Sequence, residues 1–308
     1  MNDRIYLDQI VPAELDRRRL DQVLAALCPA YSRSQIQHWI RDGFVQVNDR
    51  VESKPRAAVY FGQQIHVAAE LPQPASWRGE EIPLNRVYQD DDILVIDKPA
   101  GLVVHPGAGN PTHTLVNALL HYDPKLALLP RGGLVHRLDK ETSGLLVVAR
   151  NLTAHHHLIR LLQLRTMKRE YEAIVQGVIA QNGMINTRIG RHPIQRTKMS
   201  VVDNGKPAVT HYSVLQRFRA HTHVRVQLET GRTHQIRVHF AHIKFPLIGD
   251  PEYGRKQSAN EKFSFPRQAL HAVQLSLSHP RTGETCSWTS PLPADMQELL
   301  QQLRASEG

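Results

Sequence analysis

The first seventy residues combine helical and strand-like spacing of apolar positions. Apolar residues recur every three or four positions over 20–27 and again over 36–40, which predicts two short helices. Ser32 suits the amino-terminal cap of the second helix, and Gly43 suits its end. Two short runs with alternating apolar residues follow, up to residue 67, and they predict a small sheet.

Strand-like runs dominate the rest of the chain. Buried strands are predicted at 93–96, 145–149 and 171–179, and further strands at 208–215 and 224–228. These runs are rich in β-branched residues and too short for buried helices. Few helical segments separate them, so hairpin connections outnumber strand–helix–strand units. The pattern predicts an α+β domain with a mixed, mostly antiparallel sheet.

Local sequence signals in this second region predict a turn and two helices. Asp203-Asn204-Gly205 offers a hairpin turn ahead of the strand at 208–215. Thr233 suits the cap of a short helix that presents Ile236 and Phe240. Apolar residues from Met296 to Leu303 follow the spacing of an amphipathic helix, which we expect at the carboxyl-terminal end.

A proline-rich stretch separates the two regions. Residues 71–79 read LPQPASWRG, and two prolines and a glycine in nine positions are typical of an interdomain linker. The sequence therefore predicts a small first domain at 1–70, a linker at 71–83 and a larger second domain at 84–308.

Charge is distributed unevenly along the chain, whose formal net charge is +9. Residues 1–70 hold nine basic and nine acidic groups, whereas residues 150–202 hold nine basic groups against two acidic ones. Such a local excess attracts polyanions, which favours a nucleic-acid partner. Charge alone is equally compatible with a solvated surface that serves only solubility.

The remaining composition favours a protein of the cytoplasm. The chain has two cysteines, Cys28 and Cys286, without a disulfide or metal-ligand pattern, as in reducing compartments. The first ten residues mix charge and polarity unlike a signal or transit peptide. No apolar run approaches the roughly 20 residues that span a bilayer. We expect no membrane association.

One charged bend has the pattern of a reactive site. Asp139 lies two positions after Arg137, and the apolar strand predicted at 145–149 follows at once. A polar loop that leads into a buried strand can hold a reactive group rigidly at a cleft. The same residues could instead form a structural ion pair within the loop. Asp139 is therefore the first candidate for a catalytic carboxylate.

Four segments extend this observation into a family resemblance. They are IDKPAGLVVHP from residue 96, GLVHRLDKETSGLLVVAR from 133, KREYEAIVQG from 168 and LETGRTHQIRVHFAHIKFPLIGDPEYG from 228. Their order and spacing resemble the RluA-type pseudouridine synthases over residues 84–300. HPGAGNP, RHPIQRTKM and GKPAVTHY resemble the branch that modifies uridines in a stem-loop of 23S ribosomal RNA. His113 is a departure, because that branch has glycine there.

The amino-terminal region carries its own resemblance. SRSQIQHWIRDGFVQVN, from residue 32, is similar to the small αL-type RNA-binding domain found in many pseudouridine synthases. In that module the second helix and the following loop contact RNA. The resemblance implies that the phosphate contacts are Arg33, Arg41, Lys54 and Arg56. A helical cap with solvated arginines is the alternative, because the segment has no net positive charge.

The resemblance also assigns roles to residues of the second domain, which should have the pseudouridine synthase fold. It implies that Asp139 acts as nucleophile or as base toward a sugar proton, and that Arg237 holds it, with Arg232 as the alternative. A uracil within a stem must be turned out of the helix. Tyr171 would stack on that uracil and exchange a proton with it, unless it is only a core tyrosine. Two further residues belong to base flipping and RNA binding: Arg137, which would fill the vacated stack, and His136, which would fix the loop.

The family reaction is an isomerisation, so we expect neither a cofactor nor a metal. The expected partner is RNA, either 23S rRNA or a precursor of the large ribosomal particle, bound by a monomer. Three alternatives stay open: the same chemistry on another rRNA site or tRNA, a non-catalytic ribosome-assembly factor, or hydrolysis of a glycosidic bond. Hydrolysis needs a second carboxylate across the cleft, and none stands clearly near the motifs.

Overall fold

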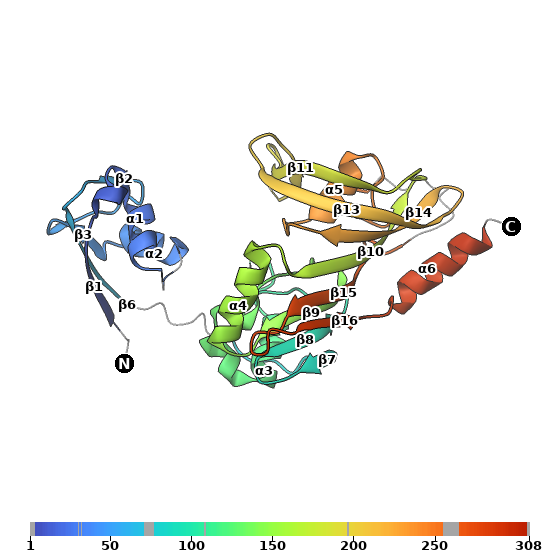
Figure 1. Cartoon of the computed structure of the whole chain (residues 1–308), viewed down its shortest axis with the longest axis horizontal. Helices are drawn as coiled ribbons and strands as arrows, with labels where there is room; N and C mark the ends of the chain where they lie inside the picture. Colours follow the sequence, from blue (N-terminus) through green and yellow to red (C-terminus); the bar gives the residue numbers. More distant parts are fainter. Residues whose placement is uncertain are drawn as a thin grey trace. The chain divides into compact units, whose positions relative to one another are not determined.

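The computed structural model describes residues 4–29, 31, 33–70, 77–107, 109–195, 197–254 and 265–306. The chain divides into two compact units, Met1–Ser76 and Trp77–Gly308 (Figure 1). Ser32, the predicted helix cap, and residues 71–76 of the predicted linker lie outside the described residues. No described helix has the length and apolar character needed to cross a membrane.

The first unit is a four-stranded antiparallel sheet with two helices. The strand order is β1-β6-β3-β4, and two further short strands, β2 and β5, pair with each other. Trp39 and Ile36 from α2 pack with Leu20 and Leu24 from α1 in its core. The elements are β1 (Arg4–Ile10), η1 (Ala13–Leu15), β2 (Arg18–Arg19), α1 (Leu20–Leu27), α2 (Arg33–Arg41), β3 (Val45–Val47), β4 (Arg50–Val51), β5 (Ala58–Val59) and β6 (Gln64–Glu70).

The second unit is built on a ten-stranded sheet in the order β12-β11-β13-β14-β10-β15-β9-β8-β7, with β16 paired to β15. Among the described strand pairs only β15 and β9 run parallel, which confirms the predicted mixed, mostly antiparallel sheet. Its strands are β7 (Arg86–Gln89), β8 (Ile93–Lys98), β9 (Ser143–Ala149), β10 (Lys168–Gln176), β11 (Gly183–Arg191), β12 (Met199–Val201), β13 (Lys206–Arg217), β14 (His221–Leu228), β15 (Leu270–Ser278) and β16 (Thr285–Thr289).

Helices cover both faces of this sheet (Figure 1). Because neighbouring strand residues point to opposite faces, Leu94 and Ile96 of β8 pack with α3, whereas Ile93 and Val95 pack with α4. α5 shares the cluster of α3, and α6 packs against Ile174 of β10. The helices are α3 (Leu115–Tyr122), η2 (Pro124–Leu128), η3 (Pro130–Gly133), α4 (Leu152–Gln163), α5 (Gln235–His242) and α6 (Ala294–Ala305).

Two local expectations were wrong. The backbone N–H of Gly205 closes a turn by donating to Val202, but the strands on either side both pair with β11, so no hairpin forms. Thr233 does not cap α5: the residue before that helix is His234, in a left-handed conformation with φ 55° and without a side-chain capping bond. β11 lies between the two strands and pairs with both of them, and His234 instead of Thr233 takes the position before α5.

Residues 77–83 belong to the second unit, although the sequence assigned them to the linker. Trp77 packs against the core that contains α3. The backbone N–H of Glu80 donates to the carbonyl of Asn117, and the Asn117 side chain donates to the carbonyl of Arg78. The part of the stretch that contains both prolines, residues 71–76, is not described.

Candidate active site

Asp139 lies in the loop that connects η3 to β9, and a buried lysine holds this loop. Lys98 is 1% exposed, and its Nζ donates to the carbonyls of Pro99, Leu102 and Lys140 at 2.7, 2.9 and 2.9 Å. Burial lowers the pKa of Lys98 to about 7, although the charges of nearby carboxylates, Asp139 among them, oppose that shift. The lysine thus ties the residue after Asp139 to the end of β8.

His136 anchors the other side of the same loop. Its Nε2 accepts a hydrogen bond from the backbone N–H of Val147 at 3.1 Å. Burial, together with the charge of Arg169, lowers the pKa of His136 to about 3. The imidazole is therefore neutral at pH 7 and serves as an anchor, whereas Arg137 next to it is exposed.

Arg237 of α5 joins three carboxylates, and Asp139 is one of them. Its Nη1 donates to Oδ2 of Asp139 at 3.2 Å. Its Nε and Nη2 donate to both oxygens of Asp250 at 2.8 and 2.9 Å, and Nη2 also reaches Glu252 at 3.3 Å. The Tyr253 ring lies under the guanidinium, 5.0 Å from Cζ to centroid. The guanidinium plane is fixed before any substrate binds.

The charges of this cluster support one another. Burial alone would lower the pKa of Arg237, but the hydrogen bonds and charge of Asp250 raise it. Burial would raise the pKa of Asp250, yet the bonds and charge of Arg237 and the N–H groups of Tyr253 and Glu252 hold it low. Both groups are therefore charged at neutral pH.

His234 is the second neighbour of the Asp139 carboxylate. Its Nε2 lies 3.8 Å from Oδ1 of Asp139, and its Nδ1 is 2.8 Å from the hydroxyl of Tyr253. Burial and the charge of Arg237 lower the pKa of His234, against the opposing effect of Asp139. The sequence motifs do not single out His234 as a neighbour of Asp139. Only its left-handed backbone conformation, which the sequence does not reveal, turns it toward Asp139.

Tyr171 points from β10 into the same region. The strand pairing of β10 with β15 is irregular between Glu170 and Glu172, so a bulge lies opposite Tyr171. The extra residue lies on β15, while Tyr171 keeps its regular pairing with Val226 of β14. Tyr171 is 6% exposed, and burial raises the pKa of its hydroxyl, which is therefore protonated at neutral pH.

Asp139, Tyr171, His234 and Arg237 all line one cavity of about 570 Å³. Arg232, the alternative partner of Asp139, also lines it, but its Nε donates to the carbonyl of Pro207. The pairing therefore falls to Arg237. The wall is strongly basic, because two carboxylates, Asp139 and Glu229, face six arginines: Arg131, Arg137, Arg165, Arg169, Arg232 and Arg237.

The predicted phosphate contacts of the first unit differ in environment. Arg33 donates to the fully buried carboxylate of Asp21, with its Nη2 3.0 Å from Oδ2, so part of its role is structural. Arg41 donates to a neighbouring glutamine at 3.3 Å, and its side chain lies at the surface. Lys54 and Arg56 are exposed.

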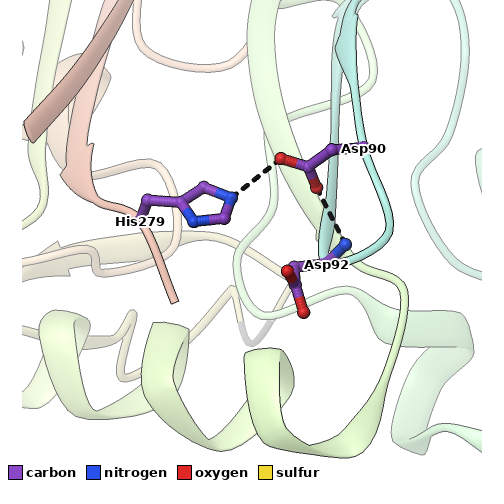
Figure 2. A group of neighbouring side chains, drawn as sticks. All are labelled: Asp90, Asp92 and His279. Carbon is purple, nitrogen blue, oxygen red and sulfur yellow. Dashed lines mark hydrogen bonds and ion pairs between the residues drawn. The ribbon is translucent and has the colours of Figure 1, made fainter. Parts of the chain in front are cut away.

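A second cluster, of Asp90, Asp92 and His279, has the composition of a metal site (Figure 2). However, all four carboxylate oxygens already accept hydrogen bonds from protein donors. These donors are Tyr88, His279, Asn151, Arg281 and the backbone N–H groups of Asp92 and Ile93. Burial opposes ionisation of Asp90, but the bonds from Ile93 and its other donors lower its pKa to about 2. The cluster fits a structural ion network.

Comparison with known families matches both units. The model of the RNA pseudouridylate synthase family matches residues 92–242, which include Asp139, Tyr171 and Arg237. The S4 domain model matches residues 18–65. These ranges fall within the second and first units respectively.

Curated and solved proteins give the same result. The chain is 53% identical to ribosomal large subunit pseudouridine synthase D of Pseudomonas aeruginosa, over 99% of this chain and 98% of that protein. It is 49% identical to the protein of the same name from Escherichia coli (strain K12), over 99% and 96%. The structure of human RNA pseudouridylate synthase domain containing 1 aligns with a TM-score of 0.57 at 28% identity, over 74% of this chain and 97% of that one.

Proposed function

The chain belongs to the RNA pseudouridylate synthase family, and we propose that it isomerises uridine to pseudouridine in RNA of the large ribosomal subunit. The relatives that cover nearly its whole length carry that activity in their names. The observation that carries the proposal is the contact of Asp139 with Arg237 in a basic cavity that Tyr171 also lines. The family model and these relatives confirm the resemblance of the sequence motifs to this family.

The reaction needs only rearrangement of bonds within the nucleotide. The bond from ribose C1′ to uracil N1 breaks, and a bond from C1′ to uracil C5 forms. C5 loses its proton and N1 gains one, so atoms and electrons balance. The uracil must also rotate while detached, which requires a cavity that encloses it. The cavity of about 570 Å³ provides that space.

Asp139 starts the reaction in this proposal. Its carboxylate can attack C1′ or remove a proton from the sugar, and the geometry is compatible with either role. Arg237 holds the carboxylate through Nη1. Tyr171, whose hydroxyl is protonated, can stack on the uracil and transfer a proton as the ring rearranges. Exposed Arg137 can fill the stack that the uridine leaves.

The first unit would supply additional RNA contacts. S4 domains are RNA-binding modules in many pseudouridine synthases, and exposed Lys54 and Arg56 are available to phosphates. We further infer that the protein acts as a monomer in the cytoplasm, on 23S rRNA or a precursor particle. The groups that this proposal uses, Asp139, Tyr171 and Arg237, lie in one cavity of the second unit, and both cysteines, Cys28 and Cys286, are free thiols.

Tritium release tests this proposal directly. Large-subunit rRNA labelled at C5 of uridine is incubated with wild type and with Asp139→Ala, both as naked RNA and as ribosomal particles. We expect release by the wild type alone. Asp139→Asn should keep the RNA affinity of the wild type, which shows that the loss is chemical. Release from tRNA alone would move the substrate to tRNA, and no release from any RNA would favour a non-catalytic assembly factor.

A further inference from the structure

Arg169 is a buried arginine without a partner. It lies on β10, two residues before Tyr171, and is 7% exposed. Its Nε is fully enclosed, and no described residue accepts a hydrogen bond from its guanidinium or pairs with its charge. A buried charge without a partner is costly and uncommon in proteins.

Other buried arginines of this unit are compensated. Arg237 binds three carboxylates, and Arg267, which is 4% exposed, pairs with Asp295 at 2.7 Å and with backbone carbonyls. Arg165 lines the same cavity as Arg169, but it is half exposed and lies 3.2 Å from Glu229. Among the three buried arginines, Arg169, Arg237 and Arg267, Arg169 is therefore the one for which the described residues supply no anion.

The position of the Arg169 guanidinium depends on a glycine. A Cβ at Gly231 would lie 2.7 Å from Nη1 of Arg169 and 3.7 Å from its Cζ. The guanidinium therefore occupies the space above the Gly231 backbone, on the wall of the cavity. Arg169 and Tyr171 point to the same face of β10, about 7 Å apart along the strand. The free charge therefore stands beside the place assigned to the uracil.

We propose that Arg169 forms a phosphate subsite, which binds the backbone phosphate next to the reacting uridine. The phosphate is the anionic group of RNA, and the planar fork of a guanidinium matches it. Phosphate and base of one nucleotide are separated by the ribose, which would then lie beside Asp139. The subsite would hold the sugar against that carboxylate while the base rotates. This inference rests on the proposed function.

A chemical change in the RNA tests the subsite. After the modified uridine is mapped, a stem-loop that contains it is made with one uncharged methylphosphonate linkage, either 5′ or 3′ of that uridine. Affinity and single-turnover rate are measured for wild type and Arg169→Gln. Loss of a charged hydrogen bond is worth about 10- to 100-fold in affinity. We expect one of the two linkages to weaken wild-type binding by this factor. Arg169→Gln should lose the same factor of affinity on native RNA, and it should bind that modified RNA no more weakly than it binds native RNA.

Three controls separate the subsite from simpler explanations. Arg165 already has a carboxylate partner, so it serves as the control arginine. The affinity loss from Arg165→Gln should multiply with the loss from either methylphosphonate linkage. Gly231→Ala keeps Arg169 but displaces its guanidinium, so it should reproduce the Arg169→Gln pattern. The melting temperature of Arg169→Gln should not fall, because no described protein partner is lost.

The outcomes for the subsite and for the proposed function are distinct. In one outcome the wild type releases tritium, but the affinity loss from Arg169→Gln multiplies with the loss from each methylphosphonate linkage. That result would reject the subsite and leave the proposed function standing. Absence of wild-type release from any RNA would overturn the proposed function. In that case the salt dependence of binding to whole large-subunit rRNA still decides: a lost phosphate contact lowers the slope of log affinity against log salt by about 0.7–0.9, and Arg169→Lys should restore it. An unchanged slope for Arg169→Gln would reject the subsite.

Discussion

Replacement of Asp250 by asparagine should show how strongly the active site depends on the buried ion cluster. Asp250 has a fully buried side chain and accepts two hydrogen bonds from Arg237, at 2.8 and 2.9 Å. It also accepts from the N–H groups of Glu252 and Tyr253. Asp250→Asn keeps the shape and one acceptor oxygen but removes the charge and turns one acceptor into a donor.

The size of the effect follows from the burial. Breaking a buried ion pair by removing one partner costs about 3–5 kcal/mol. Arg237 retains Asp139 and Glu252, so we expect the lower limit, a loss of about 3 kcal/mol in the free energy of unfolding. In a domain of this size that loss lowers the melting temperature by about 6–12 °C. The turnover rate should fall by about 100-fold, because Arg237 no longer fixes Asp139.

The pH dependence has a defined sign. Arg237 and two N–H groups hold the pKa of Asp250 below its ordinary value of 3.8. The stabilisation is therefore complete above pH 3.8 and is lost as the pH falls through the lower pKa of the folded protein. The stability difference between wild type and Asp250→Asn should be constant from pH 8 to pH 5 and should narrow below pH 4. Urea unfolding at pH 7, 5 and 3.5 measures it.

A matched pair elsewhere provides the control. Asp295 binds Arg267 in the same two-bond geometry, at 2.7 and 3.0 Å, but its side chain is 39% exposed. Asp295→Asn should cost about 1 kcal/mol and leave turnover unchanged. Equal stability losses in the two variants, or wild-type turnover in Asp250→Asn, would refute the reasoning.

Three further predictions concern other parts of the molecule. Tyr171→Phe should slow single-turnover isomerisation by about 10²–10⁴-fold while RNA affinity in filter binding stays constant, since only a proton-transferring hydroxyl is removed; an unchanged rate would leave Tyr171 as a core residue. Lys98→Met should destabilise the fold by about 1–3 kcal/mol, because three carbonyls lose their donor. Burial lowers the pKa of Lys98 from 10.5 to about 7, so between these pH values the unfolded chain binds more protons than the folded one. The free energy of unfolding of the wild type should therefore increase as the pH rises through this range. Urea titrations at pH 7 and 9 should show this increase in the wild type and not in Lys98→Met. Arg33→Ala should lower the melting temperature of the first unit, whereas Lys54→Ala combined with Arg56→Ala should leave it unchanged and reduce the salt dependence of RNA binding.

The elements that were predictable have a strong local pattern. β8, β9 and α6 lie within a few residues of their predicted positions, because their apolar residues repeat with a clear period or form a compact run. β1 was missed: Ile5 and Leu7 pack on the core, but the strand is partly exposed, and it is stabilised by pairing with β6 about sixty residues away. Such a partner leaves no signal in the strand itself.

Backbone conformation was a second feature that could not be predicted from the sequence. His113 stands where the family resemblance predicts glycine, and its φ of 55° lies in the left-handed region that favours glycine. Glu80 supports the exception: it accepts from the backbone N–H of His113 and lies 2.9 Å from its Nδ1. The departure therefore fits the same loop conformation, which the sequence alone does not reveal.

The arrangement around Arg237 shows why sequence patterns identified the pair of Asp139 and Arg237 but not the residues that support it. The pairing with Asp139, 98 positions away, was expected only from the family resemblance, and the supporting carboxylates Asp250 and Glu252 were not recognised at all. Their function depends on geometry: Asp250 occupies the Nε–Nη2 edge of the guanidinium, and Tyr253 lies against its face. Nη1 is thereby left for Asp139, the partly exposed carboxylate that lines the cavity. A carboxylate held by an arginine that cannot turn keeps its orientation, and in the proposed reaction Asp139 would therefore stay in place while the uracil moves.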